Sequence, residues 1–145
     1  MLTLKVKLRT LASPVFRRLM TMPGVGNMTA LAYSATIDDP ARFRHSANVG
    51  AYLGLTPRRY ASGEIDRMGR ISRCGDALAR SYLYEAANVL LTRSRATNPL
   101  KARGLKIAKR SGFKKARVAL ARKMAVVLHR MWLSQTDFGA HTANA

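Results

Sequence analysis

The stretch from residue 50 to 76 carries the residues whose types and spacing could do chemistry. It contains a Ser-Gly turn at Ser62 and Gly63. Guanidinium groups bind phosphate oxygens through paired, charge-assisted hydrogen bonds, so arginines around a hydroxyl suit a phosphate. A serine beside a glycine is nevertheless far more often a turn residue than a nucleophile, and Ser46 and Ser72 are comparable candidates. The arginines around the turn are Arg58, Arg59, Arg67, Arg70 and Arg73.

The charge of the chain indicates a polyanionic partner. Its 145 residues include 26 Lys and Arg against 7 Asp and Glu, for a formal net charge of +19. This excess is far beyond what solubility needs, so nucleic acid is the first expectation and an anionic membrane surface the second. No apolar run is long enough to cross a bilayer, and the single cysteine, Cys74, cannot form a disulfide within the chain. We therefore expect a cytoplasmic protein that is associated with the nucleoid and with no membrane.

A glycine hairpin near the N-terminus is the second motif with possible chemistry. A helix is predicted from Ser13 to about residue 21, and the letters PGVG at 23–26 separate it from an apolar run at 28–37. A helix-hairpin-helix of this kind can grip DNA backbone, because amides at the start of the second helix face a phosphate. The alternative is that Gly24 and Gly26 only make a tight turn between two helices.

The rest of the chain is predicted to be mainly helical. Ser46 can cap a short helix whose Val49, Tyr52 and Leu53 face inward. Residues 60–71 predict a small β-hairpin or an irregular loop. The predicted fold class is therefore mainly α, with a helix-hairpin-helix, then the small β-hairpin or loop, then a helical C-terminal half. Helical periodicity and stop signals place the later helices at 76–95, 100–110 and 113–131.

The last predicted helix combines an apolar stripe with basic faces. The stripe is expected to be core and consists of Phe113, Ala116, Leu120, Met124, Val127 and Met131. No acid lies between Glu85 and Asp137, so the basic faces gain by meeting phosphates. A membrane-bound amphipathic helix would look similar, but this stripe lacks the expected aromatic width. The basic faces carry Lys123 and Arg130 and, as our named candidate contacts, Lys114, Lys115, Arg117 and Arg122.

The run from Ser13 to about Phe138 resembles the C-terminal domain of one insertion-sequence transposase family, the IS-one-ten family of DEDD or bridge-RNA-guided recombinases. Residues 13–134 are the part similar to this serine-bearing domain, residues 1–12 are unmatched, and residues 135–145 are expected to be a disordered tail. The matching segments are RRLMTMPGVGNMTA at 17–30, FRHSANVGAYLGLTPRRYASGEIDRMGRIS at 43–72, GD at 75–76, YEAANVLL at 84–91 and LKIAKRSGFKKARVALARKMAVVLHRMW at 105–132.

The resemblance implies one half of a two-part enzyme for DNA transposition and recombination. Members carry a RuvC-like half with an Asp-Glu-Asp-Asp tetrad, which holds divalent metal such as Mg²⁺, and a second half that supplies a serine nucleophile. By motif position that nucleophile corresponds to Ser62, which would form a covalent phosphoserine link to DNA. The hairpin arginines would then hold the scissile phosphate. A structured guide RNA and a homo-oligomer are further implied partners.

Two departures from the family pattern limit this expectation. Cys74 stands where another basic residue is expected before the GD pair. The seven acids are too few and wrongly disposed to make the tetrad, and the histidines are not at ligand spacing, so no metal site is expected in this chain. We therefore expect a truncated bacterial member, with no cofactor of its own and inactive by itself. The alternatives are a non-catalytic basic nucleic-acid-binding module or a decayed transposase remnant.

Overall fold

The computed structural model describes residues 13–62, 65–71, 75–95 and 97–139, and within 57–70 it describes the backbone. The expectations for Gly63, Arg73, Ser72 and residues 1–12 lie outside the described residues. The elements, in chain order, are α2 (Pro14–Leu19), α3 (Asn27–Ile37), the 3-10 helix η1 (Pro40–Arg42), α4 (Ala47–Tyr52), β1 (Pro57–Ser62), β2 (Ile65–Ile71), α5 (Ala77–Thr92), α6 (Pro99–Ser111) and α7 (Phe113–Ser134).

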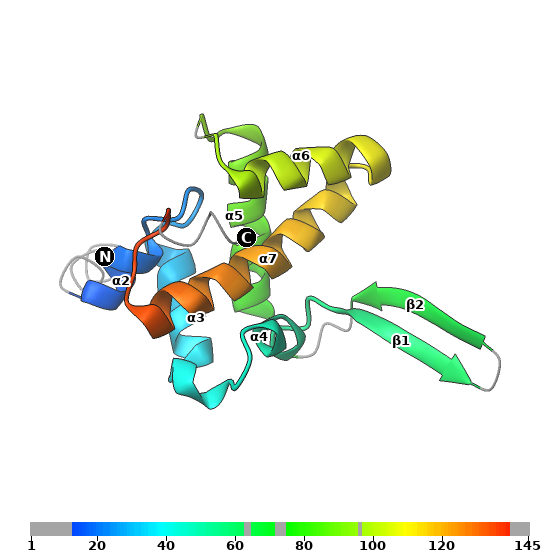
Figure 1. Cartoon of the computed structure of the whole chain (residues 1–145), viewed down its shortest axis with the longest axis horizontal. Helices are drawn as coiled ribbons and strands as arrows, with labels where there is room; N and C mark the ends of the chain where they lie inside the picture. Colours follow the sequence, from blue (N-terminus) through cyan, green and yellow to red (C-terminus); the bar gives the residue numbers. More distant parts are fainter. Residues whose placement is uncertain (1–12, 63–64, 72–74, 96, 140–145) are drawn as a thin grey trace.

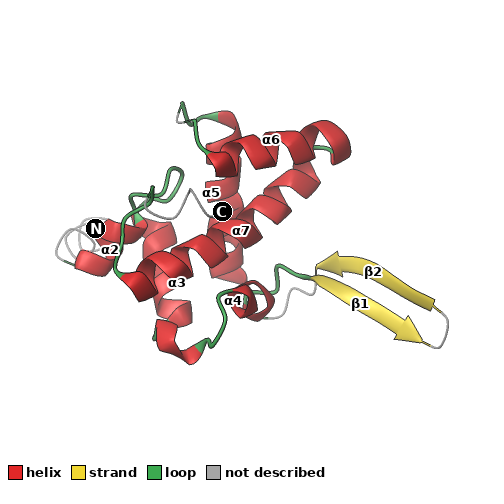
Figure 2. Ribbon diagram, viewed as in Figure 1, coloured by secondary structure: helices red, strands yellow, loops and turns green. Residues whose placement is uncertain are grey.

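The fold is mainly α and is built around α7, as Figures 1 and 2 show. This helix packs against α2, α4, α5 and α6. The predicted stripe is confirmed as core from Ala116 to Met131, whose members are all buried. Phe113 is the exception, because this first residue of α7 lies at the corner with α6 and remains 47% exposed.

Local sequence signals explain where the later helices begin. The Asp76 carboxylate accepts a hydrogen bond from the Ala79 amide at 2.8 Å, which caps α5. The Asn98 side chain accepts one from the Lys101 amide at 2.9 Å, which caps α6. Gly112 ends α6 with φ 93° and ψ 161°, a conformation that favours glycine, and α7 begins at the next residue. The turn at Gly112 lets α6 and α7 pack against each other.

The loop between α2 and α3 is a packed turn. Gly24 has φ +92°, and a Cβ built on it would lie 2.5 Å from the Ala86 carbonyl oxygen of α5. The loop backbone therefore touches α5 at a point where only glycine fits. Farther along α3, the buried Tyr33 hydroxyl donates to the Ala125 carbonyl of α7 at 2.7 Å. These two contacts attach the N-terminal helices to the rest of the core.

Two expectations for the segment around α4 are wrong. Tyr52 is 39% exposed instead of facing inward. Its ring meets Phe43 edge-on at 5.1 Å between centroids, and Arg42 lies over it at 5.5 Å. Ser46 precedes α4 but makes no side-chain cap, because its hydroxyl is hydrogen-bonded to His129 of α7. Both side chains serve tertiary contacts that local periodicity does not encode.

The segment that follows α4 forms a two-stranded antiparallel hairpin that projects away from the helical body (Figure 1). Ser62 pairs with Ile65 beside the turn, and Tyr60 pairs with Arg67. The register is irregular between Pro57 and Arg59, which is typical of a β-bulge.

The first part of the predicted tail lies against the body. Gln135 ends α7 in a left-handed conformation. Phe138 packs partly buried against the core, and its amide donates to the Thr21 hydroxyl at 2.8 Å. Residues 140–145 lie outside the described residues.

Candidate nucleic-acid interface

The hairpin places Ser62 at the end of β1, next to the turn. Because residues alternate between the two faces of a β-ribbon, the register puts position 62 on the same face as position 67 and puts Arg59 on the opposite face. Arg58 lies in the irregular part of β1, and Arg70 lies near the end of β2. Four of the five predicted arginines, Arg58, Arg59, Arg67 and Arg70, thus lie along one ribbon, with Ser62 beside its turn.

Ser46, the rival serine, has a partner of its own. Its hydroxyl lies 2.8 Å from Nδ1 of His129. Nε2 of that imidazole lies 2.8 Å from the Pro40 carbonyl, which can only accept, so Nε2 carries the proton and Nδ1 accepts from Ser46. His129 is fully buried, and Ser46 is half-buried. A serine donating to an oriented imidazole is the arrangement of an activated nucleophile, and it is also an ordinary buried hydrogen bond.

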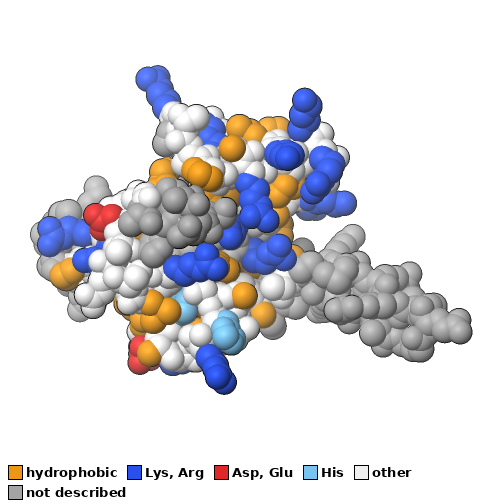
Figure 3. Space-filling model, in the orientation of Figure 1, with side chains coloured by type: hydrophobic (Ala, Val, Ile, Leu, Met, Phe, Trp, Pro, Cys, Tyr) orange, Lys and Arg blue, Asp and Glu red, His pale blue; other side chains and the backbone are white. Residues whose placement is uncertain are grey.

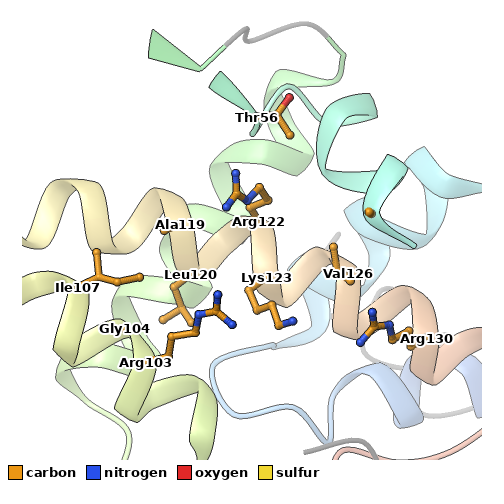
Figure 4. A pocket seen from close by; sticks show the side chains of 11 residues that line it. Thr56, Arg103, Gly104, Ile107, Ala119, Leu120, Arg122, Lys123, Val126 and Arg130 are labelled. Carbon is orange, nitrogen blue, oxygen red and sulfur yellow. The ribbon is translucent and has the colours of Figure 1, made fainter. Parts of the chain in front are cut away.

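A basic cavity of about 390 Å³ lies between α6, α7 and the start of α4 (Figure 4). We call it the basic cup and define it by its cations: Arg103 from α6, and Arg122, Lys123 and Arg130 from α7. Apolar side chains, Ile107, Leu120 and Val126 among them, form its lining between the charges. Among the described residues, no carboxylate lines it. Figure 3 shows Lys and Arg side chains gathered over α6 and α7, with the visible acids elsewhere.

The charges of the cup repel one another. The pKa of Lys123 is lowered from its ordinary value, first by burial and then by the positive charges of Arg130, Arg103 and Arg122. Burial and like charges both disfavour an ammonium ion. A bound anion would offset the repulsion from the three arginines and raise the pKa of Lys123.

One edge of the cup reaches the root of the hairpin. Thr56, which immediately precedes β1, belongs to the lining, and Arg122 lies on its side of α7 in Figure 4. A Cβ on Gly50 of α4 would lie 2.9 Å from Cγ of Arg122. The glycine therefore lets the stem of Arg122 lie directly on the α4 backbone.

The other predicted contacts on α7 lie in different surroundings. Arg117 is half-buried, donates to the Tyr84 hydroxyl at 3.1 Å, and lies 5.8 Å from the centre of that ring. Lys114 and Lys115 are exposed on the first turn of α7. Arg122 alone of the four named residues lines the cup. The sequence placed Lys123 and Arg130 on a basic face of the last helix, where their seven-residue spacing aligns them. It gave no signal for Arg103, which comes from another helix.

The predicted glycine site is separate from the cup. Gly24 and Gly26 border a hollow of about 330 Å³ that Glu85 also lines. The contact of Gly24 with Ala86 gives this residue a packing role. Gly26 is exposed, and a Cβ there would meet no atom within 4 Å. A phosphate contact at these glycines stays a prediction, and a carboxylate in the same hollow would oppose it.

The described part of the chain contains neither a membrane-spanning helix nor a cluster of metal-ligating side chains. None of its helices is long and apolar enough to span a bilayer. Within the same residues, no group of three or more His, Cys, Asp and Glu is placed to hold a metal ion.

Comparisons with known proteins identify the family. The model of the transposase IS116/IS110/IS902 family matches residues 16–103. The transposase for insertion sequence element IS1111A of Coxiella burnetii is 32% identical over 123 residues, which cover 84% of this chain and 34% of that protein. A probable family 20 transposase of Pseudomonas aeruginosa is 31% identical over 123 residues, covering 84% and 36%. A putative transposase of Sinorhizobium fredii is 32% identical over 140 residues, covering 94% and 36%. The chain thus spans about a third of the length of these curated relatives, and it belongs to the IS116/IS110/IS902 transposase family.

Proposed function

We propose that this chain is the serine-bearing, DNA-contacting part of an insertion-sequence transposase. One observation carries the proposal: in a member of this family, a ribbon with Ser62 beside its turn projects from a basic helical body. A projecting ribbon can reach a DNA strand while the body grips the backbone around it.

The proposed chemistry is nucleophilic attack on a DNA phosphodiester. Ser62 Oγ forms a bond to phosphorus while one sugar oxygen departs and takes up the serine proton. The phosphoserine then transfers its phosphoryl group to a sugar hydroxyl of another strand, which restores the serine. Each transfer exchanges one phosphoester bond for another, so no external energy source is required. Arg67, whose position shares a face of the ribbon with Ser62, would offset charge on the phosphoryl oxygens, and Arg58, Arg59 and Arg70 would bind neighbouring phosphates.

The family resemblance adds partners to the proposal. It implies a RuvC-like half whose carboxylates hold Mg²⁺, a structured guide RNA, and a homo-oligomer that works on the nucleoid. The described residues hold no carboxylate cluster that fits such metal ions, and the serine steps proposed above use only this chain's own side chains. We propose that catalysis requires these additional parts.

A covalent protein–DNA adduct tests the nucleophile. The chain is combined with a RuvC-like half supplied in trans, guide RNA and labelled element-end DNA, and is analysed on a denaturing gel. We expect an adduct with the wild type that Ser62→Ala abolishes. Ser46→Ala and Ser72→Ala are the matched controls and should both retain it. No wild-type adduct in any combination, or loss with Ser46→Ala alone, would overturn the assignment to Ser62.

The basic cup favours a second candidate function. Its four cations need no serine chemistry, so the chain could act as a non-catalytic nucleic-acid-binding module. In that case the same assay gives no adduct, whereas nucleic-acid binding with strong salt dependence remains.

A further inference from the structure

We propose that the basic cup holds one backbone phosphate of a nucleic acid, at a site separate from the phosphate that Ser62 would attack. The identity of the ligand as nucleic acid rests on the proposed function. The existence of an anion site rests on the cup itself.

Some bases of the body outside the cup have a protein acceptor. Arg80 donates to the Leu53 carbonyl at 3.2 Å, Arg42 donates to the Ile37 carbonyl at 3.0 Å, and Lys101 donates to the Ser94 carbonyl. By contrast, within the described part of the chain the side chains of Arg103, Arg122, Lys123 and Arg130 donate no hydrogen bond and form no ion pair. Their donors are available to a ligand.

The packing of the helices keeps these cations together. Gly104 lies one residue after Arg103, and a Cβ on it would lie 2.7 Å from Leu91 Cδ2 of α5 and 3.2 Å from Leu120 Cδ2 of α7. The absence of a side chain lets α6 approach both neighbours closely. Arg103 is thereby held opposite Lys123 and Arg130, whose side chains lie on the same side of α7 as Arg103 in Figure 4. The repulsion among them persists because their helices are fixed by core packing.

The lining selects the class of anion. Several cations around a cavity that has no carboxylate among its described lining residues favour a group with multiple negative oxygens, and the three guanidinium groups match the geometry of phosphate oxygens. The apolar lining offers a surface for the sugar carbons beside a backbone phosphate. A phosphodiester with its sugars can contact both the cations and the apolar side chains of the cavity.

The cup and Ser62 are too far apart to share one phosphate. Thr56 lines the cup, and the six residues of β1 separate it from the turn. At about 3.3 Å per residue, this strand spans about 20 Å. Consecutive phosphates along one strand of a duplex lie about 3.4 Å apart along the axis, so about six base pairs would separate the two sites.

Salt-dependent binding of matched variants tests the cup. The probes are a fluorescent DNA duplex of 20 base pairs and a fluorescent RNA of 20 nucleotides, measured by anisotropy. The cup variant is Arg103→Gln with Arg130→Gln, two exposed residues whose loss leaves the core intact. The control is Arg17→Gln with Arg93→Gln, which removes the same charge from exposed positions outside the cup.

We expect the cup variant to reduce the slope of log K against log salt by about 1 with the preferred probe. Since one slope unit is a factor of ten per decade of salt, the ratio of wild-type to variant affinity should be about tenfold larger at 0.1 M salt than at 1 M. The probe that suffers the loss identifies the source as DNA or RNA. Equal slopes for the cup and control variants with both probes would overturn the proposal.

Lys123 supplies an independent measurement in the same protein. A bound phosphate stabilises its ammonium form, so NMR titration should show the pKa of Lys123 rising when the preferred nucleic acid is added. An unchanged pKa at saturation would contradict the proposal. Ser62→Ala should keep the full salt slope, so failure of the serine chemistry and failure of the cup give different results.

Discussion

At the scale of single residues, the burial of Tyr33 should make the stability of the fold depend on pH. Its side chain is 1% exposed, and its hydroxyl donates to Ala125 of α7. Burial raises the pKa of this phenol well above its ordinary value, because the phenolate would lose its hydration. The neutral form is therefore the one that the folded state favours.

The expected consequence is alkaline destabilisation. A folded-state pKa raised above the unfolded value contributes stability that is complete below pH of about 10 and is lost as pH rises toward the folded pKa. Tyr33→Phe should cost about 1 kcal/mol at pH 7, through the lost hydrogen bond, but should lose less stability than the wild type between pH 9 and 11. Urea unfolding across this range measures both effects. Tyr52→Phe, at an exposed position, should keep the wild-type slope, and an unchanged slope in Tyr33→Phe would refute the argument.

The role of His129 comes from tertiary contacts. Its side chain is 0% exposed, and its two ring nitrogens are hydrogen-bonded to Ser46 and to the Pro40 carbonyl. The serine that local sequence nominates as a helix cap is used instead to fill one of those positions. Partners 83 and 89 positions away along the chain decide the role of the imidazole.

At the scale of elements, the α2–α3 turn separates two glycines that the PGVG motif treats alike. Gly24 has a positive φ and touches the α5 backbone, whereas Gly26 has an ordinary φ of −104° and open space around it. Packing thus requires a glycine at position 24 and leaves room for a side chain at position 26.

Alanine substitutions should distinguish the two positions. Gly24→Ala places a methyl group against the Ala86 carbonyl in a left-handed conformation, and we expect a loss of about 2–4 kcal/mol. Gly26→Ala should change stability by less than about 1 kcal/mol. Thermal or urea unfolding measures this difference. If Gly26→Ala weakens DNA binding at unchanged stability, the predicted phosphate contact gains support, whereas equal stabilities of the two variants would contradict the packing argument.

At the scale of the whole molecule, the net charge of +19 sets a long-range attraction for polyanions. The described acids do not line the cup, and Figure 3 shows the bases over α6 and α7 on the face in view. On this face the bases over α6 and α7 form a basic surface that includes the cup.

The salt dependence of binding by the intact chain follows from this distribution. If about six to eight phosphates are neutralised, log K for duplex DNA should fall with log salt at a slope of about −5 to −7. Anisotropy titrations between 0.1 and 0.5 M salt measure the slope. A nearly flat dependence would argue against a backbone-gripping interface, whatever the chemistry at Ser62.

The sequence by itself determined the class of fold, the helix starts and the charge of the chain. Asp76 and Asn98 cap the next helix through contacts only three residues away, and the stripe of α7 repeats every three to four residues. Such signals are local, so they survive without knowledge of the partner helices. The family motif around Ser62 was equally visible, since it depends on order and spacing along the chain.

The tertiary structure decided which side chains meet. Periodicity could not show that Tyr52 and Phe113 stay exposed, because exposure depends on where neighbouring elements end. Nor could it join Arg103 to Lys123 and Arg130, since that cluster exists only where α6 crosses α7. The packing at Gly104 and the turn at Gly112 set the angle and distance between α6 and α7. The basic face of α7 becomes one wall of a cavity only because α6 forms the opposite wall.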